Sequence, residues 1–211
     1  MMVKKVYAFD FDGTLTTKDT LLEFIRFARG NTTFLFGFLL FSPLLVLMKL
    51  KLYPNWKAKQ RVFSWFFKGM LIDDFNHLCT KFAFHNKQLL RSKGMKAIKK
   101  AIEEGAQVVI ISASIDNWVR PFFDEMGNNI IVVGTKIEVN NNHLTGKFTT
   151  NNCYGVEKVR RLQALFPQRE TYTLIAFGDS RGDKELLAYA NQGFYKPFRE
   201  SQEYNENACL R

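Results

Sequence analysis

The sequence predicts an α/β protein in which a parallel sheet lies between two helical layers and a helical cap is inserted. Short apolar segments of strand length alternate with segments of helical periodicity, which is typical of parallel strands covered by helices on both faces. This alternation stops between residues 31 and 90 and then resumes. Acidic residues directly follow two of the expected strands, at the position where open parallel sheets bind ligands.

The first two expected elements are a buried strand and an amphipathic helix. Residues 3–9 contain two valines and two aromatic side chains and end at an Asp-Gly loop, which favours a strand. Residues 20–29 carry apolar side chains at helical spacing, and Gly30 is expected to end that helix. Either Asp19 or Thr20 fits as its N-terminal cap.

Residues 31–90 form the predicted cap. They contain long apolar stretches, scattered basic residues and two prolines, Pro43 and Pro54. Because the alternation of strands and helices resumes afterwards, we predict a core domain composed of residues 1–30 and 91–211, with the helical cap inserted between its two parts.

The remaining core elements follow the cap in regular order. Helical periodicity predicts helices at residues 92–104, 116–126, 155–166 and 184–190. Short apolar runs predict strands at residues 107–112, 130–133, 173–177 and 193–195. Residues 136–148 are expected to form a hairpin that turns at three consecutive asparagines, Asn140, Asn141 and Asn142.

The charge of the chain is basic and unevenly distributed. There are 30 Lys and Arg residues against 20 Asp and Glu residues, a formal net charge of +10. No acidic residue lies between Glu23 and Asp73, whereas this interval holds eight basic residues and twelve of the 31 aromatic residues. A basic balance of this kind leaves three partner classes to consider: nucleic acid, a membrane surface and an anionic substrate.

Cysteine usage and the N-terminal residues favour the cytoplasm. The three cysteines, Cys79, Cys153 and Cys209, are widely spaced and odd in number, so they suggest neither a disulfide framework nor a pair of metal ligands. Near the N-terminus two lysines are followed at once by Asp10 and Asp12, which leaves no room for the apolar core of a signal peptide.

Two carboxylates follow the first expected strand. Asp10 and Asp12 lie two residues apart and precede Gly13 and Thr14, a combination that suits a tight loop presenting both acids to one site. The alternative is an ordinary polar turn, since Asp, Gly and Thr are all common turn residues.

Three later segments carry further candidates. Ser112 ends an apolar strand, where its hydroxyl and nearby N–H groups suit an oxyanion. Lys158 begins a helix, and its alternative role is that of a solvated surface lysine. Asp179 and Asp183 follow another apolar strand and suit Mg²⁺, which prefers carboxylates and water; alternatively they form a polar turn that caps the next helix.

In this order along the chain, these residues resemble the haloacid dehalogenase superfamily of phosphatases. The signature of that superfamily is a DxDGT loop, a strand-ending Ser or Thr, a Lys and a GDxxxD segment. The resemblance implies a Rossmann-like core and covers most of the chain outside the cap. An insertion between the DxDGT loop and Ser112 is similar in position to the C1-type cap of the phosphoserine-phosphatase-like branch.

The resemblance also implies a role for each residue. Asp10 matches the nucleophile that forms an aspartyl-phosphate, and Asp12 matches the general acid and base. Ser112 and Lys158 would bind the phosphoryl oxygens, while Thr14 would order the loop.

The cofactor implied by the resemblance is Mg²⁺. Its ligands would be Asp10, the backbone carbonyl of Asp12 and Asp179, with Asp183 as a further ligand or directly behind them.

The substrate is indicated less directly. Asp19 lies where phosphoserine phosphatase has a substrate-sensing Glu, although it also fits as a helix cap. The residues Ser112, Ala113 and Ser114 differ from the Ser-Gly-Gly of that enzyme, which argues against free phosphoserine.

The composition of the cap favours a lipid substrate instead. Residues 31–48 carry no charge and approach the roughly 20 residues that span a bilayer, although Gly37, Ser42 and Pro43 interrupt them. A pair of buried cap helices is the alternative. Basic and Trp side chains typical of an interfacial rim follow this run: Lys49, Lys51, Trp56, Lys57, Lys59, Arg61 and Trp65.

The sequence therefore predicts a Mg²⁺-dependent phosphomonoester hydrolase acting on a lipid phosphate such as phosphatidylglycerophosphate, because the apolar cap also looks like that of the phosphatidylglycerophosphatase C type. The alternative substrate is a small soluble metabolite resembling phosphoserine. A nucleic-acid-binding module is a distant alternative, because the aromatic residues cluster in Phe-Leu runs instead of alternating with basic residues. We expect a cytoplasmic protein that contacts the inner face of an anionic membrane.

Overall fold

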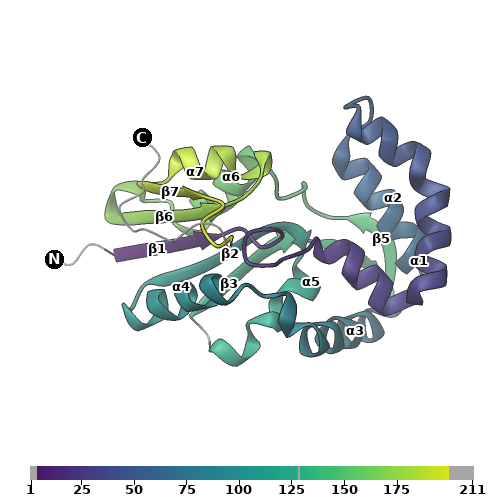
Figure 1. Cartoon of the computed structure of the whole chain (residues 1–211), viewed down its shortest axis with the longest axis horizontal. Coiled ribbons are helices and arrows are strands. Elements are labelled where there is room, and N and C mark those ends of the chain that lie inside the picture. The colour runs from purple at the N-terminus through teal and green to yellow at the C-terminus, as the bar shows by residue number, and fades with distance from the viewer. Residues whose placement is uncertain (1–3, 128, 200–211) are drawn as a thin grey trace.

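The computed structural model describes residues 4–127 and 129–199, and its core is a five-stranded parallel sheet (Figure 1). The strand order is β3-β2-β1-β6-β7, which confirms the predicted α/β class. The strands are β1 (Lys4–Phe9), β2 (Gln107–Ile115), β3 (Ile130–Thr135), β6 (Tyr172–Gly178) and β7 (Gln192–Tyr195). Val3 and Cys209, which entered the sequence predictions, lie outside the described residues.

Helices cover both faces of this sheet. Figure 1 shows α4 (Ser92–Glu103) and α5 (Asp116–Val119) on one side, with α6 (Val156–Leu165) and α7 (Lys184–Tyr189) on the other. The alternation of side chains along β1 explains the two layers. Tyr7 and Phe9 belong to one buried apolar cluster with residues of α4, whereas Val6 and Ala8 belong to a second cluster with residues of α6 and α7.

The strand order brings two acidic loops together. Strand β1 lies between β2 and β6, so the chain leaves its central strand first toward one edge of the sheet and later toward the other. Phe9, the last residue of β1, pairs with Phe177 near the end of β6. The loops that begin at Asp10 and Asp179 therefore start side by side at the carboxyl edge of the sheet, at its topological switch point.

The predicted helix at residues 116–126 is wrong in its length. Helix α5 stops at Val119 and is followed by two 3₁₀ turns, Arg120–Phe122 and Asp124–Met126. Pro121 explains the interruption, because proline lacks the N–H that a continuing α-helix needs at this position.

The predicted helical insertion is confirmed between β1 and β2. It consists of α1 (Thr20–Lys49), α2 (Asn55–Phe67) and α3 (Ile72–His85). Gly30 has φ 78° and ψ 165°, so α1 is broken where the sequence predicted a helix end, and the chain then continues as a second helical segment. The cap boundaries at residues 31 and 90 stay a prediction.

A hairpin from the core packs onto the cap. Strand β5 (His143–Phe148) lies against α2 in Figure 1, and β4 (Ile137–Asn140) pairs with β5 in antiparallel orientation. The N–H of Gly69 donates to the carbonyl of Leu144 at 2.8 Å, and the N–H of Leu144 donates to the carbonyl of Met70 at 2.8 Å. The turn has positive φ at Asn141 and Asn142, as the Asn run predicted.

Part of the aromatic excess forms the interior of the cap. Five Phe side chains are completely buried and contact one another edge-on or tilted: Phe24, Phe63, Phe67, Phe75 and Phe82. The ring of Phe24 stacks on Trp118 of α5 at 5.0 Å, which joins this cluster to the core. The alternative of buried cap helices is thus correct for one face of α2, whereas Gly37 is the one buried residue within 31–48.

The remaining cap surface stays apolar and exposed. Among the described residues, one helix is both long enough and apolar enough to cross a membrane, and this helix is α1. Only 6% of its most apolar 18-residue window is buried. Large apolar side chains of this segment face outward: Leu35, Phe36, Leu39, Leu40, Val46 and Leu47. A helix that is apolar on all sides normally finds a partner for each side.

Candidate active site

Asp10 is the first residue after β1 and lies in a buried ion-pair network. Its carboxylate is 5% exposed and accepts a hydrogen bond from the hydroxyl of Thr14 at 2.8 Å. Lys158, at the start of α6, is 1% exposed; its Nζ lies 2.5 Å from Oδ1 of Asp10 and 2.6 Å from Oδ1 of Asp183. The alternative that Lys158 is a solvated surface lysine is therefore wrong.

The electrostatics of this network follow from burial and mutual charge. Burial raises the pKa of Asp10 to about 7, against the opposing effect of Lys158 and with a further increase from Asp183. Burial alone would lower the pKa of Lys158, but its two carboxylate partners raise it above the usual range. Lys158 thus carries a positive charge that is held in place between Asp10 and Asp183.

Asp179 and Asp183 complete an acidic cluster. Carboxylate oxygens of Asp10, Asp179 and Asp183 all lie within 4.8 Å of one another. Gly13, with φ +80°, permits the close approach of the two loops, since a Cβ there would lie 2.4 Å from an Asp179 oxygen. Arg199 donates to Oδ2 of Asp179 at 3.1 Å, a contact that the sequence did not indicate.

Asp183 also orders its own loop. Its Oδ2 accepts hydrogen bonds from the N–H groups of Asp179 and Ser180 and from the Ser180 hydroxyl, at 3.2, 3.0 and 2.7 Å. This is a capping box of the 3₁₀ turn Arg181–Asp183, with Ser180 as its N-cap. Helix α7, whose N-cap is Asp183, has no side-chain cap hydrogen bond, so the polar-turn alternative is correct for the 3₁₀ turn and wrong for the helix that follows.

Asp12 is held by residues that the sequence analysis missed. Its Oδ1 accepts from the N–H and the hydroxyl of Thr20 at 2.7 and 2.6 Å, and its Oδ2 accepts from the hydroxyl of Ser114 at 2.5 Å. The indole N–H of Trp118 donates to the Thr20 hydroxyl at 3.2 Å. The second hydroxyl in the Ser-Ala-Ser run was the available signal for Ser114, whereas Thr20 was considered only as a helix cap.

Ser112 lies beside Asp12 instead of Asp10. Strand β2 continues to Ile115 and does not end at residue 112, and its pairing with β3 shifts between Ile111 and Ile115. The Ser112 hydroxyl is 3.4 Å from Oδ2 of Asp12 and accepts the N–H of Ser114 at 3.0 Å. Its expected contact with phosphoryl oxygens stays a prediction.

Asp19 caps α1. Its Oδ1 accepts from the N–H groups of Leu21 and Leu22 at 2.9 and 3.4 Å, which agrees with the helix-cap alternative. Asp19 also borders the cavity described next, so a cap and a substrate contact are compatible at this position.

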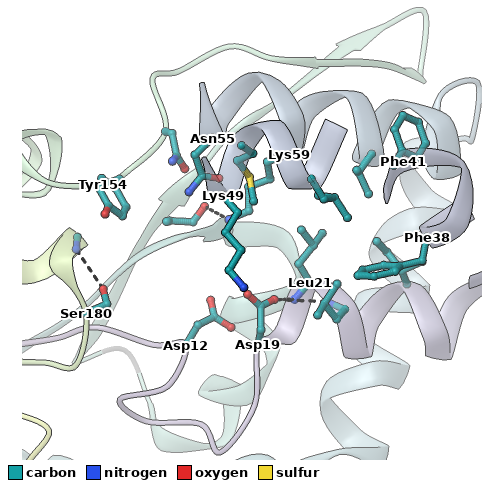
Figure 2. A pocket seen from close by; sticks show the side chains of 18 of the residues that line it. Asp12, Asp19, Leu21, Phe38, Phe41, Lys49, Asn55, Lys59, Tyr154 and Ser180 are labelled. Atoms are coloured by element: carbon teal, nitrogen blue, oxygen red, sulfur yellow. Dashed lines mark hydrogen bonds between the residues drawn. The ribbon is translucent and has the colours of Figure 1, made fainter. Parts of the chain in front are cut away.

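A cavity of about 560 Å³ joins these acids to the cap. Figure 2 shows Asp12 and Asp19 at its floor, with Lys49 and Lys59 above them and Phe38 and Phe41 to one side. Lys59, on α2, donates to the carbonyl of Ala113 at 3.0 Å, so this cation reaches the core and does not belong to an exposed basic rim.

Comparison with known proteins identifies the family. The profile of the haloacid dehalogenase-like hydrolases matches residues 7–188, which is most of the chain. The chain belongs to the haloacid dehalogenase-like hydrolase family. The predicted resemblance to this family is therefore confirmed.

Relatives of this haloacid dehalogenase-like hydrolase include proteins that match nearly its whole length. It is 33% identical over 194 residues to Protein CicA of Caulobacter vibrioides, covering 91% of this chain and 86% of that protein. A crystal structure of a protein of unknown function from Bordetella pertussis Tohama I is similar in fold, with a TM-score of 0.75 at 13% identity, covering 90% and 89% of the two chains. A phospho-aspartyl intermediate analogue of phosphoserine phosphatase has a TM-score of 0.57 at 18% identity, covering 91% and 85%.

The haloacid dehalogenase-like hydrolase thus has the predicted enzyme fold and phosphatases among its structural neighbours. Its four signature segments meet at the switch point of the sheet. Asp10, Thr14, Lys158, Asp179 and Asp183 form one cluster, and Asp12 lies at its edge with Ser112.

Proposed function

We propose that this hydrolase is a Mg²⁺-dependent phosphomonoesterase that forms an aspartyl-phosphate on Asp10 and acts on a lipid phosphate at a membrane surface. The observation that supports this best is one cavity bordered by Asp10, Asp12 and Lys158 and walled by apolar side chains of the cap. A lipid phosphate combines the same two chemistries, an anionic ester and a hydrocarbon chain, in one molecule.

The proposed reaction has two displacements at phosphorus. In the first, a carboxylate oxygen of Asp10 bonds to phosphorus, the bond from phosphorus to the ester oxygen breaks, and Asp12 gives its proton to the leaving oxygen. In the second, Asp12 takes a proton from water, the water oxygen bonds to phosphorus, and the bond to Asp10 breaks. Inorganic phosphate leaves, and both side chains return to their starting states.

Lys158 and Thr14 prepare Asp10 for this reaction. The ammonium of Lys158 and the hydroxyl of Thr14 each bind a different oxygen of Asp10, which fixes the orientation of the carboxylate. Because Lys158 is buried and charged, it also favours the negative charge of the transferring phosphoryl group.

The residues of the acidic cluster fit Mg²⁺. Three carboxylates with oxygens within 4.8 Å of one another offer the oxygen ligands that this ion prefers. Asp10, Asp179 and the backbone carbonyl of Asp12 would hold it, with Asp183 oriented behind them by its capping-box hydrogen bonds. When bound, the ion would supply positive charge that reduces the repulsion between the attacking carboxylate and the phosphate ester.

Thr20 is expected to position Asp12 for proton transfer. The Thr20→Val variant should lower kcat for alkyl phosphates by about 10- to 100-fold, because it removes a hydroxyl that binds Asp12 and general acid–base catalysis contributes ~10²–10⁴-fold. With p-nitrophenyl phosphate, whose leaving group needs little protonation, the first displacement should be affected much less. Single-turnover kinetics on both esters measure this difference.

The matched control for this experiment is Thr80→Val, which removes an exposed hydroxyl on α3. It should behave as the native protein on both esters. An equal loss of rate on alkyl and aryl esters in Thr20→Val would show that Thr20 supports the fold of the site and does not position the acid.

The outer surface of the cap suits an anionic bilayer. We propose that the cap comprises residues 31–90 together with the hairpin β4–β5, and that its exposed apolar side chains contact lipid. Lys51, Lys57 and Arg61 are exposed near Trp56, as in interfacial segments that combine apolar, basic and Trp side chains. Such a protein would be cytoplasmic and attached to the inner face of the membrane.

Membrane binding is expected to depend on these three cations. Each basic residue near an anionic leaflet contributes about 1 kcal/mol, so replacing Lys51, Lys57 and Arg61 with Gln should weaken binding roughly a hundredfold at low salt. Sedimentation with vesicles that contain or lack phosphatidylglycerol measures this effect. A control variant carries Gln at Lys96, Lys99 and Lys184, which are exposed on the core.

The control variant should sediment as the native protein does. Equal and negligible binding of all three proteins to both kinds of vesicle would contradict the membrane proposal. It would favour a small soluble phosphate ester as the substrate of the same site.

A further inference from the structure

The part of α1 that follows the break at Gly30, residues 31–49, has two apolar sides with different surroundings. One side faces outward, as described above. The other side lines the cavity together with residues of α2 and of the first turns of α1, and its main contributors are Leu22, Phe34, Phe38, Phe41, Leu45 and Val62. Most of these side chains are half-buried, because they are shielded on the protein side and open toward the cavity.

The cavity is continuous with the acidic site. The same lining that contains these apolar residues also contains Asp10, Asp12 and Lys158. Along the axis of α1, at about 1.5 Å per residue, the wall from Phe34 to Met48 extends roughly 20 Å. A volume of about 560 Å³ lies within the ~300–1,000 Å³ typical of small-molecule sites, which are mostly apolar with a few oriented polar groups.

Close packing of the two cap helices shapes this wall. Gly37 is buried on α1, and a Cβ at this position would lie 2.5 Å from the ring of Phe66 and 2.7 Å from the ring of Trp65. The missing side chain lets α1 approach α2 on one side of the cavity. Phe38 and Phe41 then remain as its lining (Figure 2).

We propose that this groove binds one unbranched hydrocarbon chain of the substrate while the phosphate ester lies at Asp10. The inference rests on the proposed function for the position of the phosphate. Its occupant follows from continuity: a ligand that fills the cavity carries an anionic end beside Lys158 and an apolar end beside Phe38 and Leu45. The cap thereby selects substrates by the length of their chain, with the end of the groove as the limit.

The test uses n-alkyl phosphates with 2 to 14 carbon atoms below their micelle concentrations, and n-alkyl phosphonates of the same lengths as non-hydrolysed ligands. Turnover of the phosphates and calorimetric binding of the phosphonates are measured on the full chain. Both kcat/KM and affinity should rise by about fourfold per added methylene until the groove is filled, and then stay constant.

Two variants at adjacent positions separate the groove from the outer face of the helix. Leu45→Trp fills the cavity and should move the plateau to shorter chains. Val46→Trp enlarges an outward-facing side chain and should leave the whole chain-length profile as in the native protein.

The outcomes distinguish this inference from the proposed function. Turnover of ethyl phosphate with no dependence on chain length would overturn the groove and leave the phosphatase intact. Chain-length-dependent phosphonate binding that Leu45→Trp shortens, without turnover of any ester, would support the groove and overturn the phosphatase. The groove would also be overturned if Leu45→Trp and Val46→Trp gave the same chain-length profile. A dimer in sedimentation velocity that persists in Leu45→Trp but is lost in Val46→Trp would equally overturn the groove, because the apolar face would then be a contact between two copies of the chain.

Discussion

The Asp10→Asn protein is expected to fold normally and to lose about 10⁴-fold or more of its phosphatase activity. An amide keeps the shape of the side chain but cannot form the acyl phosphate. Lys158 retains Asp183 as an ion-pair partner at 2.6 Å, so its buried charge stays compensated in the variant. Phosphate release measures the loss of activity. Near-UV circular dichroism and thermal unfolding show whether the variant folds normally.

A matched control and a direct assay sharpen this test. Asp124→Asn makes the same chemical change at an exposed position between α5 and β3 and should keep full activity. Native protein quenched in acid during turnover of a ³²P-labelled ester should retain label, and Asp10→Asn should not. Substantial turnover by purified Asp10→Asn would contradict a covalent intermediate on this residue.

Removal of divalent metal is expected to abolish activity, and Mg²⁺ should restore it. The reason is the acidic cluster of Asp10, Asp179 and Asp183, whose negative charge would otherwise oppose an approaching phosphate. Ca²⁺ should inhibit, since its looser coordination allows Asp10 to bind through both oxygens and lose its attacking lone pair. Activity is measured against free Mg²⁺ after treatment with EDTA.

Asp179→Asn should raise the Mg²⁺ concentration needed for half-maximal activity by at least ~10-fold, because one charged ligand becomes neutral. Asp74→Asn, exposed at the start of α3, is the control and should leave the Mg²⁺ dependence unchanged. Full activity of the native enzyme in excess chelator would rule out the metal assignment.

The elements of the core and its acidic residues could be predicted from the sequence, because each strand and the acid that follows it are recognised within one short segment. Apolar strands followed by acids place those acids at one edge of a parallel sheet, whatever the rest of the chain does. Asp10 and Asp179 therefore come together as soon as β1 pairs with β6, as the register of Phe9 with Phe177 requires. Lys158 could be added because the family motif supplies it, not because its own spacing indicates burial.

Contacts between distant segments were not accessible in the same way. Thr20 and Ser114 meet at Asp12 from opposite sides of the cap insertion, and Lys59 reaches Ala113 from α2. The periodicity of the sequence does not predict these contacts, since they depend on how the cap lies on the core. For the same reason composition could not divide the aromatic residues of the cap between its interior, the cavity and the outer surface.

The hairpin on α2 has a consequence for folding during synthesis. Strand β5 pairs with the chain at Gly69 and Met70, yet it is synthesised long after α2, the helix that it contacts. Chains emerge from the ribosome at about 5–20 residues per second, so α2 waits for several seconds without this partner. During that interval the ring of Phe63 on α2 lacks its neighbour Phe148 of β5, and a chaperone can shield this apolar face until the hairpin arrives.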